Sequence, residues 1–424
     1  MQCFSDTWCS CTATDPPPES NIRGTGQYYN FVCLRGVAEC RLNCLVYRLH
    51  TTLNTLRPAL FLALTTFFIS ACHYLFHPDP GIGKPVRWSS LPNWSNDNLQ
   101  QAWQAIDQQC PRMNRREEIW IPLCAKVAAL QNPSVNEIRQ FLQANFKPHK
   151  IHAERGRTQG LITGYYEPLL KGSLTRTDKY AYPVYSPPEE MLTIELADVY
   201  PSLEGMRLRG RLVDNKIVPY LPRSAIDGGD QPLAGNELLW IDDPYGSFFV
   251  QIQGSGRVQF EDGSIMGLDY ADQNGHPYFA VGKKLVELNE IPLEEVSLFS
   301  IRQWLQNNPS RADEVLNSNA SYVFFSLRED SQEAARGSLN VPLTEGRSLA
   351  VDKSVIPLGT LVWLDTTLPD GSDFQRLMVA QDTGGAIAGH VRADVFFGAG
   401  DRAERLAGEM KQQGSLFALL PLEN

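Results

Sequence analysis

The sequence predicts a mainly β protein with peripheral helices, because short apolar runs alternate with turn residues over most of its length. The 424 residues include 32 glycines and 28 prolines, which separate these runs. Apolar residues make up 43% of the chain and aromatic residues 10%, which is typical of a packed protein and excludes general disorder. The length is sufficient for two or three domains, or for one domain that carries a large insertion.

Three helices are expected ahead of the β-rich part. The first begins at Ser95 and places Leu99, Trp103 and Ile106 on one face. The second is expected over residues 115–130. The third follows Pro133, because Ser134-Val-Asn-Glu137 has the pattern of a capping box.

From Gly160 onwards the pattern indicates strands. Helical segments that interrupt them are expected at 277–289, 297–307 and 401–413, and the last is expected to end at Gly414 as its C-cap. The expected strands are 161–166, 182–185, 248–253, 322–327, 361–364, 376–381 and 392–397.

The first 72 residues differ from the rest and predict an export signal. Six of the nine cysteines lie before residue 45, without apolar periodicity. A 14-residue apolar run at 58–71 then ends in Ile69-Ser-Ala-Cys72, which resembles the lipobox of bacterial lipoproteins. We therefore expect Cys72 to be acylated as the new N-terminus; the alternative is a short membrane anchor that stays attached. Residues 1–45 are interpreted as the product of an upstream start site.

The mature part is expected to begin with a tether at 73–86, which is rich in proline and glycine. Beyond Cys72 it contains two cysteines, Cys110 and Cys124. An exported protein lies in an oxidising compartment, where a disulfide between these two cysteines is favoured. The alternative is a pair of buried free thiols.

Several classes of function are disfavoured by the sequence. The net charge is −10 and there is no block of lysine and arginine, so a nucleic-acid partner is not expected. His149 and His152 are close in the sequence but lack the spacing of a metal motif. The glycines near Gly384 are not followed by Lys-Ser/Thr, so they do not form a phosphate loop. No metal and no cofactor are therefore expected.

Three aspartates near the C-terminus carry the chemistry that the sequence predicts: Asp352, Asp382 and Asp394. Asp382 and Asp394 follow or lie within apolar strand segments. A carboxyl group at a half-buried strand end loses hydration, which raises its pKa towards that of a general acid. Cleavage of a glycosidic bond needs such an acid. Asp382-Thr-Gly384 also matches the Asp-Thr-Gly of aspartic proteases, but one copy requires a symmetric dimer.

Taken together, these residues carry a family resemblance. The aspartate segments resemble the three-aspartate "3D" domain, and residues 87–422 resemble the family of membrane-bound lytic murein transglycosylase A. Further matching segments are Thr163-Gly-Tyr-Tyr-Glu-Pro168, Tyr182-Pro-Val-Tyr185, Val218-Pro-Tyr-Leu-Pro-Arg223, Phe249-Val-Gln-Ile-Gln-Gly-Ser-Gly256, Gly267-Leu-Asp-Tyr-Ala-Asp272, Gly275-His-Pro-Tyr278 and Asn319-Ala-Ser-Tyr-Val-Phe-Phe325.

The resemblance implies a double-psi β-barrel into which a second, smaller β domain is inserted. The barrel domain would comprise 87–168 and 312–422, with the 3D domain at about 345–420, and the insert would be 169–311. Glycan would lie in the groove between the two, where ligand sites are common.

The resemblance also assigns roles. Asp394 would be the general acid and then the base, Asp382 would tune it, and Asp352 would order the barrel. The candidates for binding sugars are Tyr165, Tyr166, Gln253, Gly254 and Ser255; they are also interpretable as core and turn residues.

The implied reaction cleaves the bond between N-acetylmuramic acid and N-acetylglucosamine and leaves 1,6-anhydromuramic acid ends. One carboxylate suffices because the nucleophile belongs to the substrate. The alternatives are a muramidase-type hydrolase that uses Asp382 as well, and a non-catalytic peptidoglycan-binding protein. The expected partners are glycan strands of peptidoglycan and a membrane, through a lipid on Cys72. The expected location is the periplasmic side of the outer membrane.

Overall fold

The computed structural model describes residues 78–329 and 333–422. The predicted extension, signal peptide and acylated Cys72 lie outside the described residues. Within these two ranges, no helix is both long enough and apolar enough to span a bilayer.

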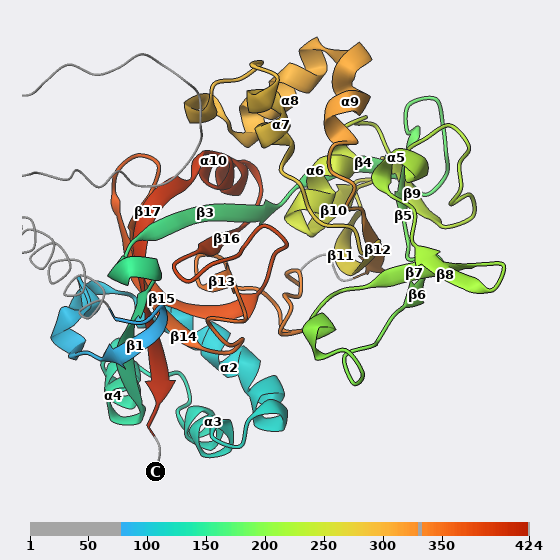
Figure 1. Ribbon diagram of the computed structural model, residues 1–424. Coiled ribbons are helices and arrows are strands. Elements are labelled where there is room, and N and C mark those ends of the chain that lie inside the picture. Colours follow the sequence, from blue (N-terminus) through green and yellow to red (C-terminus); the bar gives the residue numbers. More distant parts are fainter. Residues whose placement is uncertain (1–77, 330–332, 423–424) are drawn as a thin grey trace, which may run out of the picture. The chain divides into compact units, whose positions relative to one another are not determined.

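A closed ring of six strands forms the centre of one half of the molecule (Figure 1). Its order is β17-β14-β15-β13-β16-β3, and it closes because β3 also pairs with β17. The strand pairs β13–β15 and β16–β3 are parallel, and the other pairs in the ring are antiparallel. The strands are β3 (Gly160–Glu167), β13 (Ser348–Val351), β14 (Leu361–Thr367), β15 (Asp373–Asp382), β16 (Ala393–Ala399) and β17 (Lys411–Pro421).

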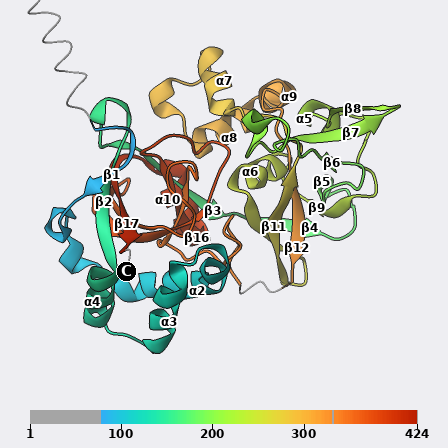
Figure 2. The same cartoon turned by 60° about the horizontal axis from the view of Figure 1, so that its bottom comes forward.

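Helices cover the outside of this ring (Figure 2). The predicted capping box is present, since Ser134 Oγ accepts from Glu137 N–H and the Glu137 carboxylate accepts from Ser134 N–H. The predicted disulfide between Cys110 and Cys124 joins the first two helices, with 5.5 Å between the Cα atoms. The helices are α2 (Leu99–Arg116), α3 (Trp120–Ala129), α4 (Val135–Asn145) and α10 (Asp401–Glu409).

The other half of the molecule contains two smaller sheets and a group of short helices. The larger sheet has the order β12-β11-β10-β4-β9-β5, and the smaller one is β6-β7-β8. The strands are β4 (Leu169–Ser173), β5 (Tyr182–Tyr185), β6 (Leu192–Thr193), β7 (Arg209–Val213), β8 (Lys216–Pro219), β9 (Glu237–Ile241), β10 (Ser255–Gln259), β11 (Ile265–Gln273) and β12 (Val323–Arg328). The helices are α5 (Arg223–Ile226), α6 (Gly246–Gln253), α7 (Val281–Glu287), α8 (Leu298–Asn307) and α9 (Ala312–Leu316).

One predicted element is wrong in type, and one predicted helix ends earlier than expected. The strand expected at 248–253 is helix α6, which ends where Gly254 adopts φ 78° and donates its N–H to Val250 O. A run of six residues, here with Gln251 and Gln253 among apolar residues, is too short for its pattern to distinguish a helix from a strand. The helix expected to end at Gly414 stops at Glu409, and β17 follows. Gly414 is needed for close packing, since a Cβ there would lie 2.6 Å from Cγ1 of Ile162.

Three predicted boundaries also change. Part of the expected tether is strand β1 (Gly81–Pro85), which pairs with β2 (Phe146–His152) at the edge of the first sheet. The first helix begins at Leu99, four residues later than expected, after a short 3₁₀ turn. The expected insert boundary at residue 311 precedes β12, but β12 pairs with β11, so the second sheet continues to Arg328.

Candidate active site

Two of the three predicted aspartates flank the same alanine. On β13, Ala350 is the partner of Asp382 on β15 and of Asp394 on β16. Residues opposite each other in a ladder project to the same face of the sheet, so both carboxylates lie on the face of Ala350. Two strand spacings separate their backbones, which corresponds to about 10 Å. Ala350 itself is buried in a cluster with Tyr165, Ile387 and Phe396.

Strand β3 adds a hydroxyl and an aromatic ring to this face. Thr163 is the partner of Asp394, and Tyr165 is the partner of Phe396. The Tyr165 and Phe396 rings pack with centroids 5.2 Å apart. This packing fixes the Tyr165 ring, and its hydroxyl donates to Asp382 Oδ2 at 3.0 Å.

The Asp394 carboxylate is held on one oxygen. The Thr163 hydroxyl donates to Asp394 Oδ1, and Arg392 Nη1 donates to the same oxygen at 2.5 Å. Only 17% of the Asp394 side chain is exposed. No hydrogen bond to Oδ2 is found among the described residues, so the described side chains leave this oxygen without a donor.

The Asp382 carboxylate, in contrast, accepts hydrogen bonds on both oxygens. Oδ1 accepts from Ser338 N at 2.8 Å, Ser338 Oγ at 2.9 Å and Thr383 N at 2.8 Å, while Oδ2 accepts from Tyr165. Burial raises the pKa of Asp382, and these hydrogen bonds offset part of the rise.

Tyr165 connects the two carboxylates electrostatically. Its pKa is raised well above its ordinary value, first by burial, then by the charge and hydrogen bond of Asp382, and further by the charge of Asp394. The phenol therefore stays protonated at neutral pH and acts as a hydrogen-bond donor.

Asp352 lies just beyond β13 and holds the loop that connects Asp382 to Asp394. Its carboxylate accepts from Ser354 N at 3.0 Å, Ser354 Oγ at 2.6 Å and Gly389 N at 2.8 Å. Partial burial alone would raise the pKa of Asp352, but these hydrogen bonds outweigh it and lower the pKa. These contacts place Asp352 as an anchor of the loop.

The other predicted sugar-binding residues lie around the end of β3. Tyr166 projects to the opposite face from Tyr165, is buried, and donates its hydroxyl to Glu404 at 3.1 Å. Its N–H donates to Gln253 Oε1 at 3.0 Å. Gly254 turns the chain into β10, where Ser255 is buried. Among the described hydrogen bonds, none joins these four residues to Asp382 or Asp394.

Three residues at the site had no predicted role. The sequence pattern could have indicated Thr163, because strand alternation places it on the same face as Tyr165. Arg392 had a similar signal, being two residues before Asp394 and next to the start of β16. No sequence pattern links Ser338 to the site, since it lies in a loop 44 residues before Asp382 in the chain.

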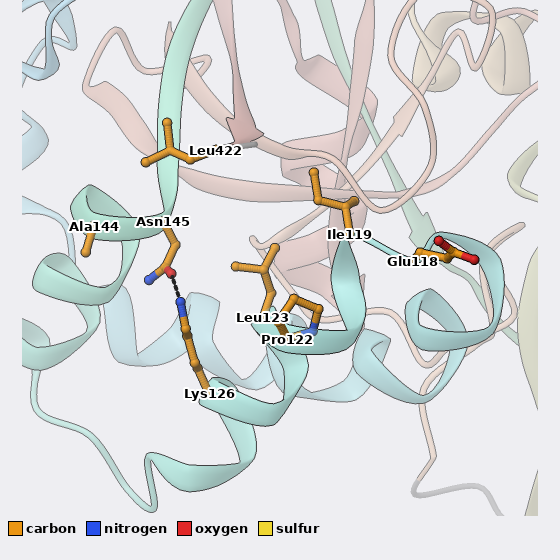
Figure 3. A pocket seen from close by; sticks show the side chains of 8 residues that line it. All are labelled: Glu118, Ile119, Pro122, Leu123, Lys126, Ala144, Asn145 and Leu422. Atoms are coloured by element: carbon orange, nitrogen blue, oxygen red, sulfur yellow. Dashed lines mark hydrogen bonds between the residues drawn. The ribbon is translucent and has the colours of Figure 1, made fainter. Parts of the chain in front are cut away.

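A hollow of about 330 Å³ lies elsewhere, and no predicted site residue lines it (Figure 3). It is formed by α3, the end of α4 and the chain beyond β17, and Lys126 Nζ donates to Asn145 Oδ1 across it at 2.6 Å. Among the described residues, no group of three or more His, Cys, Asp or Glu is arranged to hold a metal ion.

Known proteins resemble this chain in sequence and in structure. A model described as the MltA specific insert domain matches residues 161–326, and one described as the 3D domain matches residues 347–420. Membrane-bound lytic murein transglycosylase A of Escherichia coli K12 is 33% identical over 267 residues, a match that spans 61% of this chain and 65% of that protein.

Two crystal structures give a fuller match. Membrane-bound lytic murein transglycosylase from Agrobacterium tumefaciens has a TM-score of 0.71 and 31% identity, covering 80% of this chain and 97% of that one. MltA from Neisseria gonorrhoeae, in its monoclinic form, has a TM-score of 0.68 and 31% identity, covering 81% of this chain and 96% of that one.

Proposed function

This chain belongs to the family of membrane-bound lytic murein transglycosylase A, and on that premise we propose that it is a lytic transglycosylase of peptidoglycan. It cleaves the β-1,4 bond between N-acetylmuramic acid and N-acetylglucosamine and leaves 1,6-anhydromuramic acid ends. The observation that carries the proposal is that the Asp394 carboxylate accepts hydrogen bonds on Oδ1, whereas no described residue donates to Oδ2. A proton shuttle needs one oxygen held in place and one oxygen free to reach the substrate.

Asp394 acts as the acid first. Its Oδ2 carries the proton to the glycosidic oxygen, the bond from that oxygen to the muramyl C1 breaks, and the bonding pair stays with the N-acetylglucosamine oxygen. Oδ1 continues to accept hydrogen bonds from Thr163 and Arg392 throughout. The Arg392 cation then stabilises the carboxylate that forms.

Asp394 acts as the base second. The muramyl C6 hydroxyl attacks its own C1, and its proton returns to the carboxylate, so no water is consumed. An intramolecular nucleophile is held near the reacting carbon, which replaces the second carboxylate that a hydrolase needs.

The hydrolase alternative requires Asp382 to activate water or attack the sugar. Asp382 accepts four hydrogen bonds on its two oxygens, which leaves it poorly placed to do either. We assign it instead to holding Tyr165 and the loop of Ser338, with Asp352 anchoring the following loop. A non-catalytic binding protein would not need Asp394 to keep one oxygen without a hydrogen-bond donor.

We also extend the proposal to architecture and location. The six-stranded ring, with its two parallel pairs, would be the double-psi β-barrel, and the insert would extend from about residue 169 to Arg328, beyond the boundary first expected.

The names of the relatives describe them as membrane-bound, in keeping with a lipid on Cys72 and attachment to the outer membrane. Cys72→Ala should then release the protein into the soluble periplasmic fraction; retention in the membrane would contradict the anchor.

Digestion of purified murein tests the activity. We expect fragments whose muramyl ends are lighter by one water than hydrolysed sugar in the mass spectrum. Fragments with ordinary reducing ends would support the hydrolase. Binding to murein without fragments would support the non-catalytic alternative, and either result would overturn the proposal.

A further inference from the structure

A turn from the second half of the molecule is built rigidly beside the aspartates. It begins at Asn274, which is fully buried. The Asn274 side-chain amide donates to Leu221 O and Ala320 O at 2.8 Å each, and its Oδ1 accepts from Tyr322 N at 2.9 Å. Both N–H groups and the oxygen of this side-chain amide therefore have hydrogen-bond partners, which fixes the start of the turn.

The rest of the turn is held by equally specific contacts. Gly275 adopts φ 79°, and a Cβ there would lie 2.7 Å from Arg209 N, so the turn requires glycine. His276 Nε2 lies 2.8 Å from Tyr220 O, within hydrogen-bond distance. Phe279 N–H donates to Asn319 Oδ1 at 3.0 Å. Side-chain hydrogen bonds thus hold the chain on both sides of Tyr278.

What this turn presents to the aspartates is the Tyr278 side chain. Tyr278 is half-buried and packs against the loop that joins Asp382 to Asp394. Its pKa is raised first by burial and then by the charge of Asp394. On the other side lies Gly385, where an added Cβ would be 3.6 Å from the Tyr278 Cβ. Among the described residues, no hydrogen bond to the Tyr278 hydroxyl is found.

The loop of Gly385 is itself held at two points that follow this glycine. Ile387 is buried in the cluster that contains Tyr165, Ala350 and Phe396, and Gly389 is held by Asp352. Two anchored segments from distant parts of the chain therefore meet at Tyr278, beside Asp394. A rigid phenol with an unused hydroxyl costs little conformational entropy when it binds a ligand.

We propose that Tyr278 is a substrate-positioning residue that holds the muramyl sugar over Asp394, an inference that rests on the proposed function. Its ring packs on the apolar face of the pyranose, and its hydroxyl hydrogen-bonds to the sugar. This contact keeps the C6 hydroxyl close to C1 and excludes water from the position from which a nucleophile attacks C1. Tyr278 thereby determines which nucleophile completes the reaction.

Tyr278→Ala and Tyr278→Phe test this proposal on murein, with Tyr200→Ala as the control at a site where the side chain is 57% exposed. For Tyr278→Ala we expect kcat to fall roughly a hundredfold, as for a misplaced substrate, and the share of ordinary reducing ends to rise. Tyr278→Phe keeps the ring, so we expect a loss of about tenfold and a smaller rise. Tyr200→Ala should match the wild type in both respects.

Product partition separates positioning from a structural role, because a merely damaged fold lowers activity without changing the nucleophile. A Tyr278→Ala protein with wild-type kcat, or one with lower kcat and only anhydro ends, would overturn the inference. Failure of the proposed function is distinguishable, since the wild-type protein itself would then give no anhydro ends.

Discussion

Asp382 and Asp394 flank the same alanine in register, yet their surroundings differ. Asp382 is the partner of Ala350 on one side and receives four hydrogen bonds on its two oxygens. Asp394 is its partner on the other side and receives two, both on Oδ1. Position in the sheet therefore does not distinguish the two carboxylates; their hydrogen bonds do.

The difference separates two tasks that one residue type performs. A carboxylate that accepts hydrogen bonds on both oxygens fixes the groups around it, here Ser338, Thr383 and Tyr165. A carboxylate held on one oxygen keeps the other for a proton that comes and goes. The two sites thus make opposite predictions for substitution by asparagine, which keeps the shape but cannot carry the acidic proton.

Asp394→Asn should have the largest effect. Removal of general acid–base catalysis is expected to lower kcat on murein at least about a hundredfold. The fold should survive, because asparagine still accepts from Thr163 and has almost the same volume. Turnover would be followed by release of soluble fragments, with circular dichroism as the control for folding. A folded and fully active Asp394→Asn protein would remove Asp394 from the mechanism.

Thr163→Val should have the next largest effect. Valine has nearly the shape of threonine but cannot donate to Asp394 Oδ1, so the carboxylate loses one of its two hydrogen bonds. We expect kcat to fall about tenfold, which corresponds to one hydrogen bond to a charged group. Thr163→Ser retains the hydroxyl and should recover most of the rate. If valine and serine behave alike, the hydroxyl does not orient Asp394.

Asp382→Asn should lower activity less, and its clearer signature is in stability. The pKa of Asp382 is raised in the folded state, so the folded protein holds this proton more firmly than the unfolded chain. The resulting stabilisation is complete below the unfolded value of about 4 and is lost as pH rises through the folded value. The free energy of unfolding of the wild type, relative to Asp382→Asn, should therefore fall as pH rises from about 4 and then level off.

Urea unfolding of the two proteins over a pH series measures this difference. A difference that rises with pH would mean that hydrogen bonding outweighs burial at Asp382. An activity loss as large as that of Asp394→Asn would instead make Asp382 a second catalytic carboxylate and favour the hydrolase.

The disulfide should have the smallest effect on activity. It joins α2 to α3 across 14 residues, outside the ring that carries the aspartates. Substitution of both Cys110 and Cys124 by alanine should cost about 3 kcal/mol of stability, the value for a loop of this length. At a temperature well below the melting point, kcat should be unchanged. A large loss of activity in the folded variant would show that these helices affect the site.

The sequence indicated the strands that carry the aspartates better than it indicated how those strands pair. The strands of the aspartates were visible as apolar runs, and Thr163 shares a face with Tyr165 through simple alternation. The pairing of Ala350 with both aspartates was not visible, because it depends on which distant strands become neighbours. Ser338 was also not visible, since its loop reaches Asp382 only through the tertiary fold.

The errors have one physical cause. Residues 248–253 were assigned to a strand and residues 411–413 to a helix from local pattern, but tertiary contacts decide their state. The first lies in helix α6, whose Phe248 and Phe249 are buried against residues of α7, α8 and α9. The second begins with polar residues, yet β17 pairs with β2, β3 and β14 and closes the ring. Local pattern does not contain this information.

The claim that one carboxylate performs both steps is tested most directly by digestion of murein with the wild-type protein in ¹⁸O-labelled water. If the C6 hydroxyl is the nucleophile, no solvent oxygen enters the product, and every new muramyl end is an unlabelled 1,6-anhydro sugar. Reducing ends that carry the label would show that water attacks the sugar, which would require a second group such as Asp382 and contradict the assignment of both steps to Asp394.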